Sequence, residues 1–449
     1  MPSNAPFYSK FVKKNIKNKR KTGESIALRK QNQKPDRKTR SKDREPEPLL
    51  FGPPVFQGLA PQAKRILEAF PAILERILPL DSKKRAVLPQ HIQALFHELT
   101  DERGKRSMQY LNDPVKRSAY VHYYLWWNLV RITKLVQHMQ FPLEEQAVAA
   151  DFGSGPLTFI CALWIAKPEL RKKHITWYCV DISQKALSFG EELFLTLCAH
   201  TERARHSAGA TWHIKKVHGT FGTPLNEKVS LFTEANMFNE IFWNSPLSLD
   251  EQAAKACAII TQYVHPHGAV LLIEPGIPLA GSFLSLMRTK LLKSGFSIEA
   301  PCSHESSCPL PGKQHVKDLD TAEVPIAHGK WCHFVFDTAD SPHALLRLSE
   351  EAHLGKERAS LSFLYCSHKE KKHTPVGSAV RICSNIIKIG DNRLGRYACS
   401  EKGFVLLTSP AHQDSVLNKA VSGSMIFVSE EKLINTTRDK KTGALIIAL

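Results

Sequence analysis

The spacing of apolar residues changes along the chain and predicts four regions. From about residue 59 to 140, apolar residues recur three and four positions apart, which is the spacing of amphipathic helices. From about 146, short apolar runs alternate with helical segments, and from about 341 β-like runs are separated by Gly, Ser and Pro. We predict a disordered arm (1–48), a helical N-terminal region (49–145), an α/β domain (146–340) and a β-rich C-terminal module (341–449).

The alternation in the third region predicts a parallel, doubly wound sheet. QAVAADFGSG (146–155) runs from an apolar strand into a glycine turn, and ITWYCVDIS (175–183) is the next strand. KVSLFTEANMFNEI (228–241) and GAVLLIEPG (268–276) follow the same pattern, with helical segments between the strands. Strands that alternate with helices form βαβ units, so the fold class is α/β.

Two features of the helical region predict how it folds. Pro89 is expected to begin a helix, because proline at the first helical position loses no hydrogen bond. The aromatic-rich segment 118–139 is expected to be a helix packed on the α/β domain, with an RNA-stacking surface as the alternative. The longest apolar runs, such as FICALWIA (159–166), fall far short of the roughly twenty residues that span a bilayer. We therefore expect a soluble protein with no membrane partner.

Positive charge is concentrated at the N-terminus. The formal net charge is +18, and residues 1–48 carry 15 Lys and Arg against 5 Asp and Glu. A basic arm attracts nucleic acid, since binding to phosphates releases counterions. A merely solvated tail and a mitochondrial transit peptide are the alternatives. Because no apolar secretory segment follows the N-terminus, we expect the bacterial cytoplasm, with the mitochondrial matrix as the alternative.

The sequence AADFGSGPLT indicates a nucleoside site at the end of the first strand. Asp151 ends the strand, and Gly153 and Gly155 let the backbone turn sharply and approach a ligand at the carboxyl edge of the sheet. Asp181 ends the next strand, where a carboxylate can accept hydrogen bonds from both ribose hydroxyls. The acid before the glycines favours S-adenosylmethionine, whereas a dinucleotide site would want glycine at Thr158.

Two observations limit this prediction. Leu157 stands where methyltransferases usually have a third glycine, and its side chain is expected to crowd the methionine part of the cofactor, so a vestigial loop is the alternative. Asn236, in ANMFNE (235–240), is expected to line the site, but the Asn/Asp-Pro-Pro-aromatic signature of amino-group methyltransferases is missing there. No general base can be assigned, and the catalytic residues stay unknown.

The chain has ten cysteines, and several of them suggest a metal site rather than disulfides. The candidate ligands are Cys302, Cys308 and Cys332, with a fourth from Cys399, Cys383 or Cys366. Four thiolates can hold zinc or an iron–sulfur cluster. The wide C-x5-C-x23-C spacing suits a cluster slightly better, while His304 and His333 are further candidate ligands for zinc. Unrelated free thiols are the alternative.

Taken in order, the motifs of the chain resemble one family. DFGSGPLT, VDIS, NMFNEI, EPGIPLAG, APCSHESSCPL, WCHF and the late CSEKG resemble the methyltransferase-like small-ribosomal-subunit assembly proteins, known from mitochondria and with bacterial relatives. The resemblance covers about residues 90–405. Its specific part is the cysteine-containing set, because other methyltransferases lack it. A segment of about fifteen extra residues, roughly 312–328, is expected to be a surface insertion.

The resemblance implies both a fold and a function. The fold would be a class I S-adenosylmethionine-dependent methyltransferase domain with helical N-terminal and β-rich C-terminal additions. Cys302, Cys308, Cys332 and Cys399 would hold a [4Fe–4S] cluster. The protein would be a monomeric assembly factor that binds the small ribosomal subunit through its rRNA. An active S-adenosylmethionine-dependent rRNA methyltransferase and a zinc-containing RNA-binding protein with an inactive fold are the alternatives.

Overall fold

The computed structural model of the chain describes residues 51–52, 54–100, 110–202, 211–241, 245–312, 327, 329–368, 378–412, 416–429, 431–432 and 436–449. The predicted basic arm (1–48) lies outside the described residues, as does most of the predicted surface insertion (313–326 and 328). Residues 49–449 form one unit by their internal contacts.

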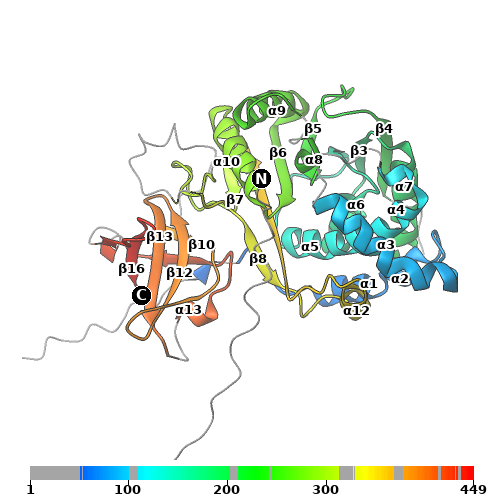
Figure 1. The fold of residues 1–449 in the computed structure, drawn as a ribbon. Helices are drawn as coiled ribbons and strands as arrows, with labels where there is room; N and C mark the ends of the chain where they lie inside the picture. Colours follow the sequence, from blue (N-terminus) through cyan, green and yellow to red (C-terminus); the bar gives the residue numbers. More distant parts are fainter. Residues whose placement is uncertain are drawn as a thin grey trace, which may run out of the picture. The chain divides into compact units, whose positions relative to one another are not determined.

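The α/β domain is built on a mixed sheet. Its strands are β2 (Ala147–Phe152), β3 (Ile175–Asp181), β4 (Trp212–His218), β5 (Val229–Ala235), β6 (Val264–Pro275), β7 (Ser297–Ala300), β8 (Phe334–Asp337) and β9 (Arg358–Ser367). Their order is β4-β3-β2-β5-β6-β9-β7, with β8 paired to β9 (Figure 1). Strands β2 to β6 are parallel, and β9 runs antiparallel to both β6 and β7. This is the doubly wound order of a class I methyltransferase fold, which confirms the predicted fold class.

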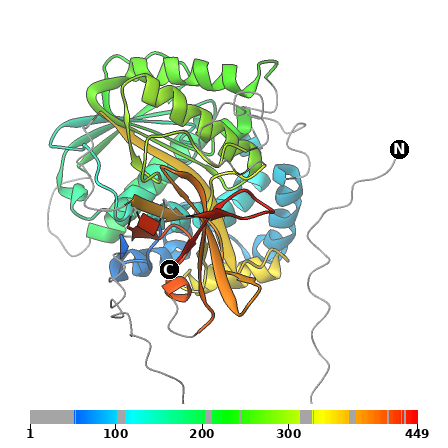
Figure 2. The same ribbon diagram turned by 90° about the vertical axis from the view of Figure 1, so that its left-hand side faces the viewer.

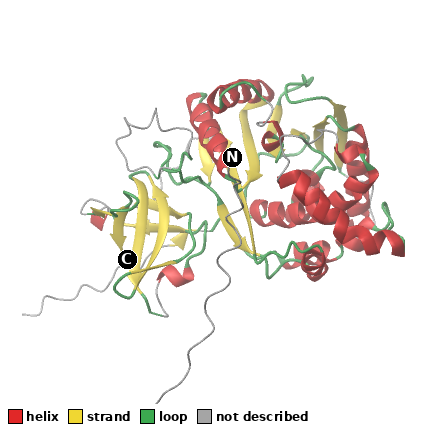
Figure 3. Ribbon diagram, viewed as in Figure 1, coloured by secondary structure: helices red, strands yellow, loops and turns green. Residues whose placement is uncertain are grey.

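Helices cover both faces of this sheet (Figure 3). They are α6 (Thr158–Ala166), η4 (Leu170–Lys172), α7 (Gln184–Glu202), α8 (Phe238–Ile241), α9 (Leu249–Tyr263) and α10 (Pro278–Lys293). Alternate strand residues face opposite layers: Ala149 and Leu231 join the core with α6 and α7, whereas Ala150 and Phe232 join the core with α9 and α10. Each face of the sheet is therefore buried, as its continuous apolar strands require.

The helical region packs against the first of these cores. Its elements are α1 (Pro61–Glu68), α2 (Phe70–Leu74), α3 (Ser82–Thr100), η2 (Tyr110–Asn112), α4 (Pro114–Ala119), η3 (Tyr120–Leu125), α5 (Trp126–Val136) and, later in the chain, α12 (His343–Glu351). Trp126 and Trp127 are buried, as predicted, and their indole N–H groups donate to Leu67 O and Ser349 Oγ. Within the part of the chain that the structure describes, no helix is long and apolar enough to cross a bilayer.

The expected helix start at Pro89 is wrong. Pro89 lies inside α3, which begins seven residues earlier in the chain at Ser82. The carboxylate of Asp81 accepts the Lys84 N–H at 2.8 Å, which satisfies one of the free donors of the first turn. The helix therefore begins at the position that Asp81 caps, although proline itself favours the first turn of a helix.

The C-terminal module is a second sheet. Its elements are β1 (Phe51–Gly52), β10 (Ser378–Ile382), β11 (Ile387–Ile389), β12 (Arg393–Ser400), β13 (Gly403–Pro410), α13 (Val416–Lys419), β14 (Met425–Val428), β15 (Thr437–Arg438) and β16 (Leu445–Ala448). The order is β1-β14-β10-β12-β13-β16-β15, with β11 paired to β12. The orange and red strands of this sheet lie together in both views (Figures 1 and 2). The predicted boundary at 340 falls before α12 and β9, which belong with the first sheet.

Helices α6 and α7 meet closely at Gly190. A Cβ atom at this position would lie 2.5 Å from the carbonyl carbon of Pro156 and 2.8 Å from the backbone nitrogen of Leu157. Real Cβ atoms do not approach backbone so closely, so α7 can lie here only because residue 190 has no side chain.

We predict that Gly190→Ala lowers the free energy of unfolding by about 1–3 kcal/mol, because the added methyl group forces α7 away from the glycine loop. The measurement is thermal or urea unfolding. Gly355→Ala is the matched control, since its Cβ would meet nothing nearer than the Glu350 side chain at 4.0 Å. Equal stability of the two variants would contradict the prediction.

Candidate functional site

The glycine loop leaves β2 at the carboxyl edge of the sheet. Gly153 and Gly155 have φ of 67° and 50°, in the left-handed region that glycine adopts without strain. A Cβ at Gly153 would lie 2.7 Å from the Cβ of Met237, so the β5 loop passes directly over the glycine. Both glycines line a pocket, as expected for a loop that lets a ligand approach the backbone.

Leu157 does not crowd this pocket. Its φ is 56°, so a leucine occupies a left-handed position where glycine is usual. Its side chain is fully buried and lies against Gly190 of α7, and Leu157 is not among the residues that line the pocket. The expected clash with the methionine part of a cofactor is therefore wrong, because the left-handed backbone turns the side chain into the protein core.

Asp151 supports the loop from below. Its carboxylate accepts the hydroxyl of Ser154 at 2.8 Å and that of Thr233 at 2.7 Å, and the residue is 1 % exposed. Burial raises the pKa of Asp151 to about 7. It is not among the pocket-lining residues, so this carboxyl group ties β2, the loop and β5 together rather than facing the cavity.

Asp181 does line the pocket, at the end of β3. One carboxylate oxygen accepts the Gly155 N–H and the other the Ser183 N–H, both at 2.8 Å. Burial raises the pKa of Asp181. Each oxygen keeps further acceptor capacity, so the group can still bind hydroxyls such as those of a ribose.

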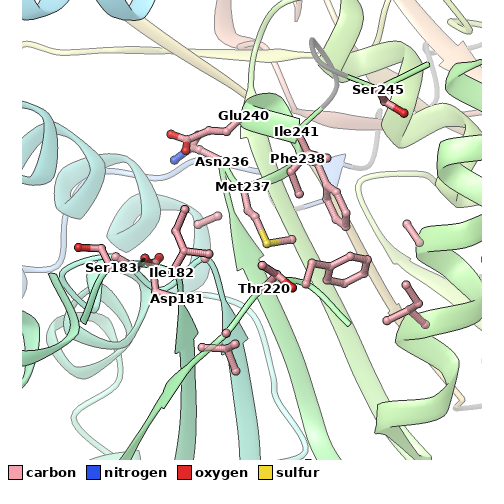
Figure 4. A pocket seen from close by; sticks show the side chains of 18 of the residues that line it. Asp181, Ile182, Ser183, Thr220, Asn236, Met237, Phe238, Glu240, Ile241 and Ser245 are labelled. Carbon is pink, nitrogen blue, oxygen red and sulfur yellow. Dashed lines mark hydrogen bonds between the residues drawn. The ribbon is translucent and has the colours of Figure 1, made fainter. Parts of the chain in front are cut away.

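The pocket itself has a volume of about 520 Å³ and is mainly apolar. Figure 4 shows Asp181 and Ser183 on one side, Asn236 and Glu240 on another, and Met237 between them. Volume and lining are those of a site for a small molecule with a few polar groups. The helical region completes the wall with Tyr110, Leu111 and Tyr120, which sequence reasoning did not single out.

A polar corner lies where α5 meets the β5 loop. Asn236 has a φ of 67°, and its Oδ1 accepts a hydrogen bond from Arg131 at 3.0 Å. Arg131 also donates to Ser360 O at 3.3 Å, and burial lowers its pKa to about 10. Burial and the charge of Glu240 raise the pKa of Tyr120 to about 12, so its phenol stays protonated and can donate. This corner can recognise polar atoms of a bound molecule.

Two carboxyl groups lie side by side beneath the β5 loop. Glu234 and Glu274 end adjacent strands and are fully buried. They accept the backbone N–H groups of Met237 and Asn239, which fixes the loop that carries Asn236. Burial raises the pKa of Glu234 well above its usual range, with the charge of Glu274 as the next cause, and burial raises the pKa of Glu274 to about 8.

Three of the predicted cysteine ligands gather on one side of β12 and β13, whereas Cys302 packs against the α9–α10 core of the first sheet. Cys308, Cys332 and Cys383 pack against the apolar cluster that holds Cys399. Burial raises the pKa of Cys332 well above its usual range, and the charges of Cys302, Cys399 and Cys308 raise it further. The four predicted thiols are thus electrostatic neighbours.

The candidates for the fourth ligand are not equivalent. Cys383 belongs to the same surroundings as Cys399, and its thiol donates to Tyr397 O at 3.4 Å. Cys366 is fully buried in the other core, between β6 and β7. Cys399 and Cys383 are therefore neighbours of Cys308 and Cys332, whereas Cys366 lies in the cluster that Cys302 packs against, where the charge of Cys302 helps burial to raise its pKa.

Two buried arginines flank these thiols. Arg288 donates to His304 O and Ser306 O at 2.8 and 2.9 Å, and its Nε is buried with no hydrogen-bond partner among the described residues. Arg381 pairs across β10 and β12 with Cys399. Over the ranges that the structure describes, no three His, Cys, Asp or Glu side chains form a ready-made metal site. The donor chemistry nevertheless suits a negatively charged inorganic group.

Comparisons with known proteins agree with this geometry. Residues 142–405, more than half of the chain, match the model of the family described as mitochondrial small ribosomal subunit Rsm22. The matched segment contains the glycine loop, Asp181 and all four predicted cysteine ligands. A search among curated proteins finds no match.

Solved methyltransferase structures are also similar. One from Pyrococcus furiosus is 14% identical and covers 35% of this chain and 68% of its own, with a TM-score of 0.23. A precorrin-6y C5,15-methyltransferase from Geobacter metallireducens is 13% identical (40% and 72% covered, TM-score 0.24). An rRNA methyltransferase from Streptomyces viridochromogenes is 10% identical (32% and 73% covered, TM-score 0.25). TM-scores this low do not support a fold assignment, so the fold class is assigned from the strand order of the sheet.

We predict that Glu274→Gln weakens the pH dependence of stability. Folded Glu234 and Glu274 hold protons that the unfolded chain releases above its usual carboxyl pKa, so their contribution is complete below about pH 4.5 and is lost as pH rises toward 8. The amide side chain of the variant can still accept the Asn239 N–H and donate to Glu234. The fall in unfolding free energy between pH 5 and 8 should shrink by about 2 kcal/mol.

The measurement is urea unfolding at several pH values. Exposed Glu192 of α7 provides the control variant Glu192→Gln, which should follow the wild-type curve. A Glu274→Gln curve parallel to wild type would refute the raised pKa values of the two buried carboxyl groups.

Proposed function

The chain belongs to the Rsm22 family of mitochondrial small ribosomal subunit proteins, and from this premise we propose that it is an assembly factor that binds the rRNA of that subunit. The single observation that carries the proposal is the family match over 142–405, which contains both the pocket loop and the cysteine segment. The family's description also favours the mitochondrial matrix over the bacterial cytoplasm expected from the sequence.

The pocket supports S-adenosylmethionine as a ligand of this assembly factor. Gly153 and Gly155 give backbone access, and Asp181 offers acceptors for ribose hydroxyls. When bound, the cofactor would supply a transferable methyl group. Glu240 and Lys255 also line the pocket, and nothing in the described part of the chain singles out either as a general base, so active rRNA methylation is the second candidate function, favoured by the pocket volume of about 520 Å³.

The cysteine group supports a [4Fe–4S] cluster held by Cys302, Cys308, Cys332 and Cys399. Four thiols on buried or partly buried residues, beside an arginine whose Nε has no hydrogen-bond partner among the described residues, fit a cluster whose total charge is negative. Two histidine rings, His304 and His333, lie in the same segment and would suit zinc. When bound, a cluster would cross-link the two sheets, and its binding energy would add to folding.

We predict that Cys302→Ser lowers iron and sulfide content and weakens co-sedimentation with small ribosomal subunits. Loss of one thiolate leaves a three-ligand site, and removal of a metal-site ligand destabilises both sheets at their junction. Protein purified without oxygen is analysed for iron, sulfide and zinc, then sedimented with isolated subunits.

The control is Cys257→Ser in α9, whose thiol lies 3.6 Å from the Ser294 hydroxyl, remote from the predicted ligands in sequence. It should keep wild-type iron. Zinc without iron in the wild type would select the zinc-containing alternative. Wild-type protein that fails to co-sediment with subunits would overturn the assembly proposal.

We predict that the protein binds S-adenosylmethionine in calorimetry and that Asp181→Asn weakens binding at least tenfold. The change removes a charged acceptor, and a hydrogen bond to a charged group is worth about 1.5–3 kcal/mol. Glu192→Gln is the control and should bind as wild type does. No heat of binding at millimolar cofactor would leave Asp181 as a loop support and exclude the methyltransferase candidate.

A further inference from the structure

The strand order of the C-terminal module defines a known nucleic-acid-binding topology. Counted along the chain, β10, β12, β13, β14 and β16 are its five main strands, and their order in the sheet is 4-1-2-3-5. The third and fifth strands, β13 and β16, are parallel, while the other neighbours are antiparallel. Helix α13 lies between the third and fourth strands. This is the Greek-key order of an OB-fold barrel.

An OB-fold binds oligonucleotides on the face of its second and third strands and on the loops after the first and fourth strands. Here that face is largely covered. Cys399, Phe404 and Leu406 pack against Leu310 and Ala327, which come from the cysteine segment of the other sheet. The loops at the rim are therefore the part of the expected surface that is left for a ligand.

The loop after the fourth strand ends in a basic hairpin, β15–β16. Arg438, Lys440 and Lys441 are exposed, and no ion pair of the described residues involves them. They surround a single acid, Asp439, whose carboxylate accepts the N–H and hydroxyl of Thr442 at 2.9 and 2.5 Å. The acid is thereby engaged inside the turn, and the three cations face outward.

The hairpin is held in place by backbone contacts and by the cysteine cluster. Asp439 N–H donates to Ala444 O, and Gly443 N–H donates to Asp439 O, both at 2.8 Å. Ala444 is fully buried in the apolar cluster of Cys399 and Leu310. Three cations on a fixed turn lose little conformational entropy on binding a phosphate backbone, unlike cations on a loose tail.

We infer that the β15–β16 hairpin, on an OB-type module, binds single-stranded RNA through its phosphates. The inference deepens the proposed rRNA-binding function, since it names the surface and the strand type. OB-folds bind single-stranded nucleic acid, and a hairpin at the rim of the barrel can contact the flexible phosphate backbone of one strand. Preference for an RNA duplex is an outcome that the experiment can reveal.

The experiment uses the full chain and a 20-nucleotide oligouridine, with fluorescence anisotropy over a range of salt concentrations. In R438Q/K440Q/K441Q, the slope of log K against log salt should fall by about 2, since each phosphate contact on a single strand contributes about 0.7. Affinity at 0.1 M salt should fall by as much as about 100-fold. K83Q/K84Q/R85Q, in the exposed first turn of α3, makes the same change in net charge and should bind nearly as wild type does.

A second readout does not depend on the stability of the variants. A 4-thiouridine oligonucleotide is crosslinked to the wild-type protein and the modified peptides are mapped. Crosslinks within 436–449 support the inference. Crosslinks only within 1–48, equal losses in both triple variants, or tighter binding to a 20-base-pair RNA duplex would overturn it. Such a failure leaves the subunit and iron measurements unaffected, so it is distinguishable from failure of the assembly proposal.

Discussion

The arrangement of both sheets depends on the buried guanidinium of Arg381. It donates from Nε to Pro301 O and from Nη1 to Gly423 O, both at 2.8 Å, so one side chain joins β10, the cysteine segment and the loop before β14. Burial lowers the pKa of Arg381, while the charges of Cys399, Cys302 and Cys332 favour its charged form. A cation kept from water needs negative charge nearby. Two carbonyl oxygens replace water around the guanidinium, and the anionic cluster proposed above would supply the negative charge at the junction of the two sheets.

The helical N-terminal region has an equally direct role at the pocket. A doubly wound sheet alone leaves the carboxyl edge open, and here η2 and η3 close one side of it with tyrosines. Arg131 of α5 reaches the β5 loop and β9 together through Asn236 and Ser360. The β5 loop is then held from above by an arginine and from below by the Glu234–Glu274 pair. Its left-handed Asn236 persists because these contacts fix it from both sides.

The sequence predicted the features that depend on local order. Asp181 follows a strand in the chain, and parallel strands bring their carboxyl ends to one edge, so its place on the pocket could be derived. The structural role of Asp151 could not be derived from the sequence. The direction of its side chain depends on Ser154 and Thr233, and Thr233 is 82 residues away in the chain. Tyr120 and Arg131 were missed for the same reason. Their helix was predicted, but which side of it faces the pocket is decided by packing.

The OB-type strand order also could not be predicted from the sequence. It is defined by strand pairings such as β13 with β16, which no short sequence pattern encodes. This topology also places the cysteine cluster on a different sheet face from the pocket. The pocket uses the ends of β2, β3 and β5, whereas Cys308, Cys332 and Cys399 belong to the cluster on β12 and β13, and none of the predicted ligands lines the pocket. A change that abolishes cofactor binding need not disturb the junction. Loss of the junction, in contrast, would release Ala444 and with it the basic hairpin. On the proposed function, attachment to RNA would therefore be coupled to the cysteine cluster and separable from cofactor binding.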